Sequence, residues 1–220
     1  MGKTALLLVD IQYDFLPKGS LAVPDGDKIL PPVYKLIEEA DKYFNLIVAS
    51  IVSYHPIHHI SFASTHGKEP FTAIEVPGVN SPEGIVQMLW PDHCVQGTKG
   101  CELEHGVQQR LIKRSHMVEY VRKGNDIAMD AYSVFSDNQK RPTPLARVLR
   151  NAGVTDVVVA GLATDYCVRA TALDARRFDF TTTILTDAVR AVDPIRGEAV
   201  ISELVKEGCN LAESTQILIP

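Results

Sequence analysis

The sequence lacks several patterns that mark common classes of protein. Its 220 residues contain no apolar stretch of membrane-spanning length and no run of basic residues, and its net charge is −5. A membrane-spanning helix needs about 20 mostly apolar residues, and proteins that bind nucleic acid usually carry a basic patch. We therefore expect neither a membrane nor a nucleic acid as a partner.

The sequence also lacks cysteines at CxxC spacing. It has four scattered cysteines, at positions 94, 101, 167 and 209. Such cysteines are typical of free thiols in an intracellular chain. The first residues, "MGKTALLLVD", enter a short apolar run that ends at Asp10, which is too short for the core of a signal peptide. The sequence therefore predicts an intracellular, cytoplasmic protein.

Short apolar runs alternate with amphipathic segments along the chain. Strands are predicted at 4–10, 45–52, 116–123, 156–162, 181–187 and 214–220, and helices at 28–43, 107–113, 144–152, 166–177 and 194–207. Near-continuous Val, Leu and Ile runs indicate strands that are buried on both faces. The pattern predicts one α/β domain over residues 1–220, a doubly wound, mostly parallel sheet with helices on both faces.

Two long stretches have no clear pattern of either kind, at 53–103 and 124–143. Loops of this length are uncommon in compact domains unless they have a function. The first holds several prolines, most of the histidines and the only tryptophan, Trp90. We interpret 53–103 as an insertion that builds a site. The second could close over the site as a lid or form a subunit contact.

Three ionisable residues follow predicted strands. Asp10 ends the first strand, Lys123 ends the third, and Cys167 lies at the start of the helix after the fourth. Ligands bind beyond the carboxyl ends of the strands in such a sheet, so we expect the three side chains to meet there. A helix start favours a thiolate. The trio predicts acyl transfer, with Asp10 as the base, Lys123 beside the thiolate, and an oxyanion hole made by the N–H groups of Ala163 and Cys167.

A second cluster consists of histidines in the stretch 53–103. His55, His58 and His59 follow the second predicted strand, and His93 lies in "LWPDHCVQGT". Imidazole is a common ligand of transition metals. Neutral histidines that form hydrogen bonds within loops are the alternative interpretation, and the residues alone leave both open.

Taken together, five segments resemble one family almost end to end. They are "LLVDIQYDFLPKGSLAVPDGDKIL", "YHPIHHISFAS", "LWPDHCVQGTKG", "RKG" and "GLATDYCVRATALDA". These segments are similar to those of the nicotinamidase/pyrazinamidase branch of the isochorismatase-like cysteine hydrolases. The resemblance implies hydrolysis of nicotinamide to nicotinate and ammonia through a thioester on Cys167. It also implies a cis peptide bond at Leu162–Ala163.

The resemblance further implies a substrate pocket and a metal. Phe15, Trp90 and Tyr132 match aromatic positions that wall the pocket, and a divalent metal, usually zinc, orients the substrate ring. Relatives carry Asp–Trp–His–Pro where this chain has Ser53–Tyr54–His55–Pro56. On this comparison His55 and His93 are the retained ligands.

Three arrangements follow from the loss of that carboxylate. Ser53 could bind a metal weakly, His58 or His59 could replace the lost ligand, or the site could be empty. The first two predict a nicotinamidase, with pyrazinamide as a second candidate substrate. The third favours a metal-poor hydrolase of another small amide or carbamoyl compound. A homo-oligomer is a further expectation from the family.

Overall fold

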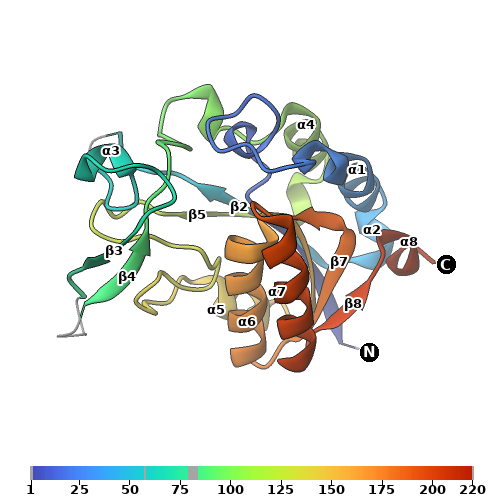
Figure 1. The fold of residues 1–220 in the computed structure, drawn as a ribbon. Helices are drawn as coiled ribbons and strands as arrows, with labels where there is room; N and C mark the ends of the chain where they lie inside the picture. Colours follow the sequence, from blue (N-terminus) through green and yellow to red (C-terminus); the bar gives the residue numbers. More distant parts are fainter. Residues whose placement is uncertain (1, 57, 79–83, 220) are drawn as a thin grey trace.

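The computed structural model describes residues 2–56, 58–78 and 84–219, and a six-stranded parallel sheet forms its centre (Figure 1). The strands lie in the order β5-β2-β1-β6-β7-β8, and every neighbouring pair is parallel. Their bounds are β1 Lys3–Val9, β2 Leu46–Val52, β5 Val118–Lys123, β6 Val154–Leu162, β7 Thr181–Arg190 and β8 Asn210–Ala212. The predicted fold class is confirmed.

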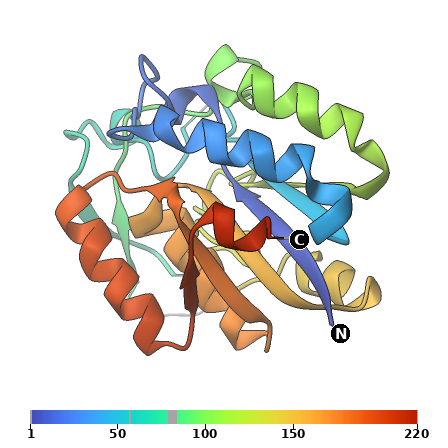
Figure 2. The ribbon, with the colours of Figure 1, turned by 90° about the vertical axis from the view of Figure 1, so that its right-hand side faces the viewer.

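Helices cover both faces of the sheet because the strand side chains alternate between two apolar clusters. In β1, Leu6 and Leu8 belong to the cluster that contains helices α1 and α4, whereas Leu7 and Val9 belong to the cluster that contains α5, α6 and α7. Figure 2 shows α1 and α4 side by side on one face. The bounds are α1 Leu30–Glu38, α2 Ala40–Tyr43, α4 His105–Lys113, α5 Leu145–Asn151, α6 Arg169–Arg177 and α7 Pro194–Lys206.

The stretch 53–103 contains regular structure that the sequence did not predict. A short helix, α3 (Ala63–His66), and an antiparallel hairpin of β3 (Ala73–Val76) and β4 (Ile85–Met88) lie here. Backbone hydrogen bonds, including Trp90 N–H to the Ser61 carbonyl at 2.7 Å, attach the hairpin's exit to the segment after β2. Residues 57 and 79–83 of this stretch lie outside the described residues.

The predicted strand at 214–220 is wrong. The sixth strand is the shorter β8, and Ser214–Ile217 form a helix, α8. A capping box explains the helix: the Glu213 side chain accepts from the backbone while the Gln216 side chain accepts from the Glu213 N–H at 2.7 Å. Pro220 lies outside the described residues. None of the helices in 2–56, 58–78 or 84–219 is long and apolar enough to cross a membrane.

Candidate active site

Three strands deliver the three predicted catalytic side chains to one point. Asp10 follows β1, Lys123 ends β5, and Cys167 follows β6 in a short π-helical turn, Thr164–Val168, that leads into α6. Lys123 Nζ lies 2.8 Å from Asp10 Oδ2 and 3.2 Å from Cys167 Sγ. All three residues are buried. The structure therefore brings together side chains that are far apart in the sequence.

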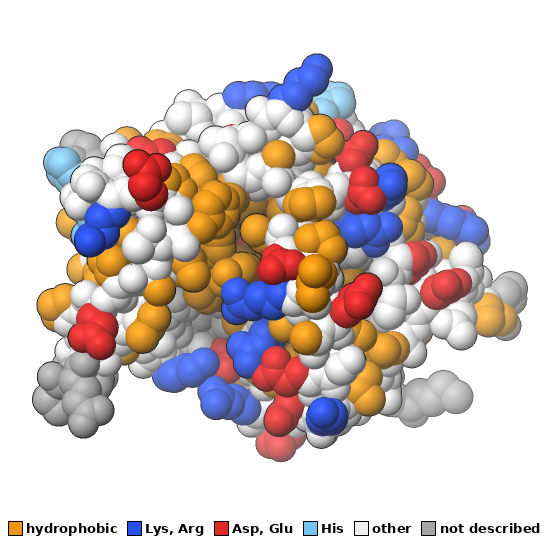
Figure 3. Space-filling model, in the orientation of Figure 1, with side chains coloured by type: hydrophobic (Ala, Val, Ile, Leu, Met, Phe, Trp, Pro, Cys, Tyr) orange, Lys and Arg blue, Asp and Glu red, His pale blue; other side chains and the backbone are white. Residues whose placement is uncertain are grey.

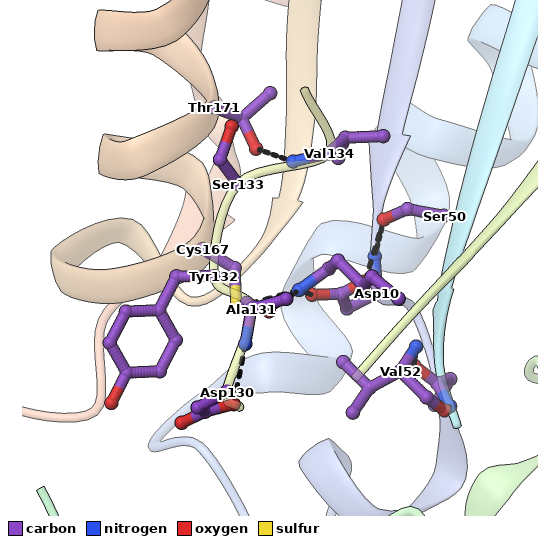
Figure 4. Close-up of polar contacts among 12 residues, drawn as sticks. Asp10, Ser50, Val52, Asp130, Ala131, Tyr132, Ser133, Val134, Cys167 and Thr171 are labelled. Atoms are coloured by element: carbon purple, nitrogen blue, oxygen red, sulfur yellow. Dashed lines mark hydrogen bonds and ion pairs between the residues drawn. The ribbon is translucent and has the colours of Figure 1, made fainter. Parts of the chain in front are cut away.

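Asp10 is held so that one carboxylate oxygen stays available. Its backbone has a positive φ of 50°, and Ser50 Oγ both accepts from the Asp10 N–H at 3.1 Å and donates to Oδ1 at 2.6 Å. Oδ2 makes the ion pair with Lys123 but accepts no hydrogen bond of good geometry among the described residues. Figure 4 shows Asp10 and Cys167 close together beside Ala131. Oδ2 can therefore receive a proton.

The Lys123 ammonium has three polar partners, as many as it has hydrogens. It donates to Cys167 Sγ and to the Ala131 carbonyl at 3.0 Å, and it makes an ion pair with Asp10. Burial alone lowers the pKa of Lys123, but the Asp10 carboxylate and the Cys167 sulfur outweigh burial and raise this pKa above its ordinary value. The ammonium therefore stays charged at neutral pH.

The pKa of the Cys167 thiol is raised, whereas its place at a helix start predicts a lowered pKa. Burial raises the pKa of Cys167; the Lys123 ammonium lowers it, and the nearby Asp10 carboxylate raises it further. A helix start favours a thiolate only where the sulfur is partly solvated, whereas this side chain is enclosed. A thiol with a raised pKa needs a proton acceptor before its sulfur can act as a nucleophile.

The backbone next to Cys167 has two unusual features. The Leu162–Ala163 peptide bond is cis, as the resemblance predicts. Gly161 has a φ of 125°, and a Cβ there would lie 2.1 Å from the Val9 carbonyl oxygen. Only glycine lets β6 approach β1 this closely. Ala163 and Cys167 line the same cavity, as an oxyanion hole formed by their N–H groups requires.

A narrow cavity of about 30 Å³ opens beside Cys167. The predicted wall residues Phe15, Trp90 and Tyr132 all line it, and Trp90 Nε1 donates to the Tyr132 hydroxyl at 3.2 Å. Its other lining residues are Leu21, Val52, Tyr54, His93, Ala163, Tyr166, Cys167 and Val192. Figure 3 shows hydrophobic side chains gathered around a hollow on this side of the molecule. The lining of this cavity is therefore largely apolar and aromatic.

The structure does not bring the predicted metal ligands together. His55 is exposed, and Ser53 lines a separate cavity of about 750 Å³ together with Ile51, Gln96 and Cys101. His93 lines the pocket, and His59 is fully buried beside Tyr54. In the described part of the chain, no group of three or more His, Cys, Asp or Glu side chains could hold a metal.

Val52, Tyr54 and Tyr166 line the pocket but were missed from the sequence. Side chains alternate along an extended strand, so Val52 at the end of β2 and Tyr54 fall on one side and Ser53 on the other. This alternation, continued past the end of the predicted strand, would have placed Val52 and Tyr54 in the pocket. Tyr166 lies in the π-helical turn, with its ring 4.6 Å from that of Trp90.

Comparison with known proteins shows which family model matches the chain and which proteins are similar to it. A family model described as "Isochorismatase domain" matches residues 4–216. The nicotinamidase of Escherichia coli is 40% identical over 194 residues, which cover 88% of this chain and 85% of that protein.

Two solved structures are similar over almost the whole chain. The yeast nicotinamidase bound to the inhibitor nicotinaldehyde is 32% identical, with a TM-score of 0.88 over 96% of this chain and 99% of that one. The pyrazinamidase of Pyrococcus horikoshii in complex with zinc is 35% identical, with a TM-score of 0.73 over 96% and 99%.

Proposed function

The chain belongs to the isochorismatase family, and from this premise we propose that it is an amide hydrolase that converts nicotinamide to nicotinate and ammonia. The observation that carries the proposal is the contact of Lys123 with both Asp10 and Cys167 beside a narrow aromatic pocket. Nicotinamide is the proposed substrate because similar proteins are named nicotinamidases.

In the proposed first step, Asp10 Oδ2 takes the thiol proton as Cys167 Sγ attacks the amide carbon. The N–H groups of Ala163 and Cys167 would stabilise the resulting oxyanion. Asp10 then returns the proton to the amide nitrogen, which leaves as ammonia, and the acyl group remains on Cys167 as a thioester. Lys123 pairs with the Asp10 carboxylate and stabilises the sulfur as it becomes negative.

In the proposed second step, a water molecule gives a proton to Asp10 and attacks the thioester carbon. Collapse of that intermediate releases nicotinate, and the sulfur recovers its proton. Phe15, Trp90 and Tyr132 would hold the ring during both steps. Residues 1–220 would act as one hydrolase domain, with the insertion 53–103 contributing Trp90 and His93 to the pocket.

The metal stays outside this mechanism. A zinc-bound relative supports a divalent ion in the family. Ser53 and His55 do not face the pocket, however, and among the described residues no group of three or more donor side chains could hold such an ion. Hydrolysis of a different small amide or carbamoyl compound is the second candidate, and the loss of these metal donors from the pocket favours it.

The test is ammonia release from nicotinamide by the purified chain, with the variant Cys167→Ala. We expect steady release by the wild-type protein and no turnover by the variant. Cys209→Ala is a matched control, because Cys209 is also buried but does not line the pocket that contains Cys167. Turnover by Cys167→Ala would exclude the thioester, and release from other amides but not nicotinamide would favour the second candidate.

A further inference from the structure

The pocket wall that contains His93 has no set of metal donors, and we infer that this enzyme works without a resident divalent ion. Val52 and Tyr54 take the place of metal-binding side chains on that wall. The inference rests on the proposed function only in calling the site a hydrolase pocket. Its argument depends on which side chains face the pocket and on what each of their polar atoms contacts.

Three neighbouring positions form this part of the wall. Val52, Tyr54 and His93 all line the cavity that contains Cys167. Of these only His93 has a side chain that zinc binds readily at neutral pH, and zinc sites need at least three protein ligands. Ser53 and His55, the donors closest in sequence, lie in the other cavity and at the surface, respectively.

Tyr54 is fixed in the pocket by a buried carboxylate. Its hydroxyl donates to Asp130 Oδ1 at 2.7 Å, and Gln87 Nε2 donates to Asp130 Oδ2 at 2.9 Å. The Ala131 N–H also donates to Oδ1 at 2.8 Å. Asp130 and Tyr54 are both almost fully buried. The Asp130 carboxylate beside this wall therefore already accepts hydrogen bonds from a tyrosine hydroxyl, a glutamine amide and a backbone N–H.

Hydrogen bonds also fix which ring nitrogen carries the proton in the two buried histidines. His93 Nδ1 donates to the Pro91 carbonyl at 2.8 Å, which leaves one free lone pair, on Nε2. His59 Nδ1 accepts from the Ser61 N–H at 3.2 Å, so its Nε2 carries the proton and offers no lone pair. The Tyr54 ring packs against both imidazoles, with centroid distances of 4.1 Å to His59 and 5.0 Å to His93. Of these two imidazoles, only His93 has a nitrogen, Nε2, with a free lone pair, whereas a zinc site needs at least three protein ligands.

The first experiment measures metal content and zinc binding rather than activity. We expect the purified wild-type chain to hold much less than one equivalent of zinc and to bind added zinc weakly in a calorimetric titration. Because Val52, Tyr54 and His93 face the same cavity, the double variant Val52→Asp/Tyr54→His should create a three-ligand site. We expect it to bind one zinc at least about 100-fold more tightly than the wild type.

Ser53→Asp is the matched control, since it adds the same carboxylate one position along the strand, on the other side. It should leave zinc affinity at the wild-type value. One equivalent of zinc retained by the wild type after dialysis would overturn the inference, as would tighter zinc binding by Ser53→Asp. If the double variant does not fold, the metal content of the wild type and the zinc affinity of Ser53→Asp still test the inference.

Turnover in the presence of a chelator separates this inference from the proposed function. Nicotinamide hydrolysis that is unchanged by EDTA and by added zinc supports both. Hydrolysis that EDTA abolishes and zinc restores overturns the inference and leaves the function in place. If nicotinamide is not hydrolysed under any of these conditions, the proposed function fails, and the zinc titrations still decide the inference by themselves.

Discussion

Asp10 and Lys123 act on the Cys167 thiol in opposite directions. The carboxylate raises the pKa of Cys167 and the ammonium lowers it, on top of the larger rise that burial causes. A residue that only holds the fold would not change the pKa of the thiol when it is replaced by an isosteric side chain. Alkylation of the thiol as a function of pH therefore tests each role separately from turnover.

Asp10→Asn should separate reactivity from catalysis. Removing the carboxylate lowers the pKa of Cys167, so alkylation by iodoacetamide should become faster near pH 8. Turnover should fall by about 10²-fold to 10⁴-fold, because the proton acceptor is lost. The measurements are the alkylation rate between pH 6 and 10 and ammonia release at one pH. The ordinary pKa of a free thiol, about 8.5, lies between these two limits.

Asp165→Asn is the control for Asp10→Asn. Asp165 is also buried, but its carboxylate accepts from the backbone N–H groups of Val192 and Asp193. Its substitution should not move the alkylation profile. A profile that is the same in Asp10→Asn and wild type would remove Asp10 from contact with the proton of Cys167.

Lys123→Met should have the opposite effect on the thiol. Loss of the ammonium raises the pKa of Cys167, so alkylation should be slower than in the wild type at every pH below the shifted value. It also leaves Asp10 buried without its ion-pair partner, which costs about 3–5 kcal/mol of stability in comparable pairs. Alkylation rates and a urea unfolding curve measure the two effects. Faster alkylation in Lys123→Met would contradict the assigned role.

At the scale of single elements, the approach of β6 to β1 is what brings the nucleophile to its base. Gly161→Ala would place a Cβ 2.1 Å from the Val9 carbonyl oxygen, one residue before Asp10. The two strands must separate, so we expect a loss of more than about 2 kcal/mol, as for an overpacked core, and a sharp drop in turnover. Urea unfolding and ammonia release are the measurements.

Gly97→Ala is the control for the Gly161→Ala clash. Gly97 also has a positive φ, of 81°, but an added Cβ would have no atom within 4 Å. Only the conformational cost of about 1 kcal/mol should appear, with turnover unchanged. Equal losses of stability in the two variants would mean that the close strand approach is not the cause.

The elements also explain why the convergence of Asp10, Lys123 and Cys167 follows from the sequence, whereas the position of the predicted metal donors does not. Asp10 and Lys123 lie directly at the ends of predicted strands, where the side-chain position follows from the parallel sheet. The metal donors were assigned by matching Tyr54–His55–Pro56 to a motif in relatives. A strand has a side-chain period of two, so an offset of one residue moves every side chain to the other face. The motif placed Ser53 and His55 in the pocket, whereas the strand places Val52 and Tyr54 there.

At the scale of the whole molecule, buried titratable groups define a pH range of stability. Burial lowers the pKa of His59 and of His93 below the ordinary value of 6.5. Each imidazole binds its proton more readily when the chain is unfolded, so the free energy of unfolding falls as the pH drops below 6.5.

Other buried groups limit stability at alkaline pH. Burial raises the pKa of the thiols of Cys94 and Cys167 above 9.0 and that of the phenols of Tyr54 and Tyr132 above 10.0. The folded chain keeps these protons to a higher pH than the unfolded chain, so stability is complete below about pH 9 and falls above it.

We therefore expect the Tm to be highest between about pH 6.5 and pH 9 and to fall on both sides. Circular dichroism melts at constant ionic strength measure this. Tyr132→Phe removes one of the alkaline groups and keeps its ring, so its Tm should fall less steeply above pH 10. A Tm that keeps rising above pH 10 would be inconsistent with protonated thiols and phenols in the folded core.

The sheet was predictable at this scale because its apolar runs are long and buried, as in β1 and β6. The hairpin of β3 and β4 was not, because its strands have four residues each and are partly exposed, with Val86 74% exposed. Such strands have no continuous apolar run for the sequence to display. Their position depends on contacts with the segment after β2 rather than on their own composition.

The order of the strands has a consequence for how activity appears during folding. Asp10 and Cys167 belong to adjacent strands in the middle of the sheet, and Lys123 comes from the edge strand β5, which reaches them only through β2. No two of these residues lie on strands that are both neighbours in the sheet and consecutive in the sequence. A partly assembled sheet lacks at least one of the three side chains at the site, so it has no partial activity. Contacts between distant parts of a chain also form slowly. Recovery of turnover after dilution from denaturant therefore reports the closure of β5, β2, β1 and β6 into one sheet.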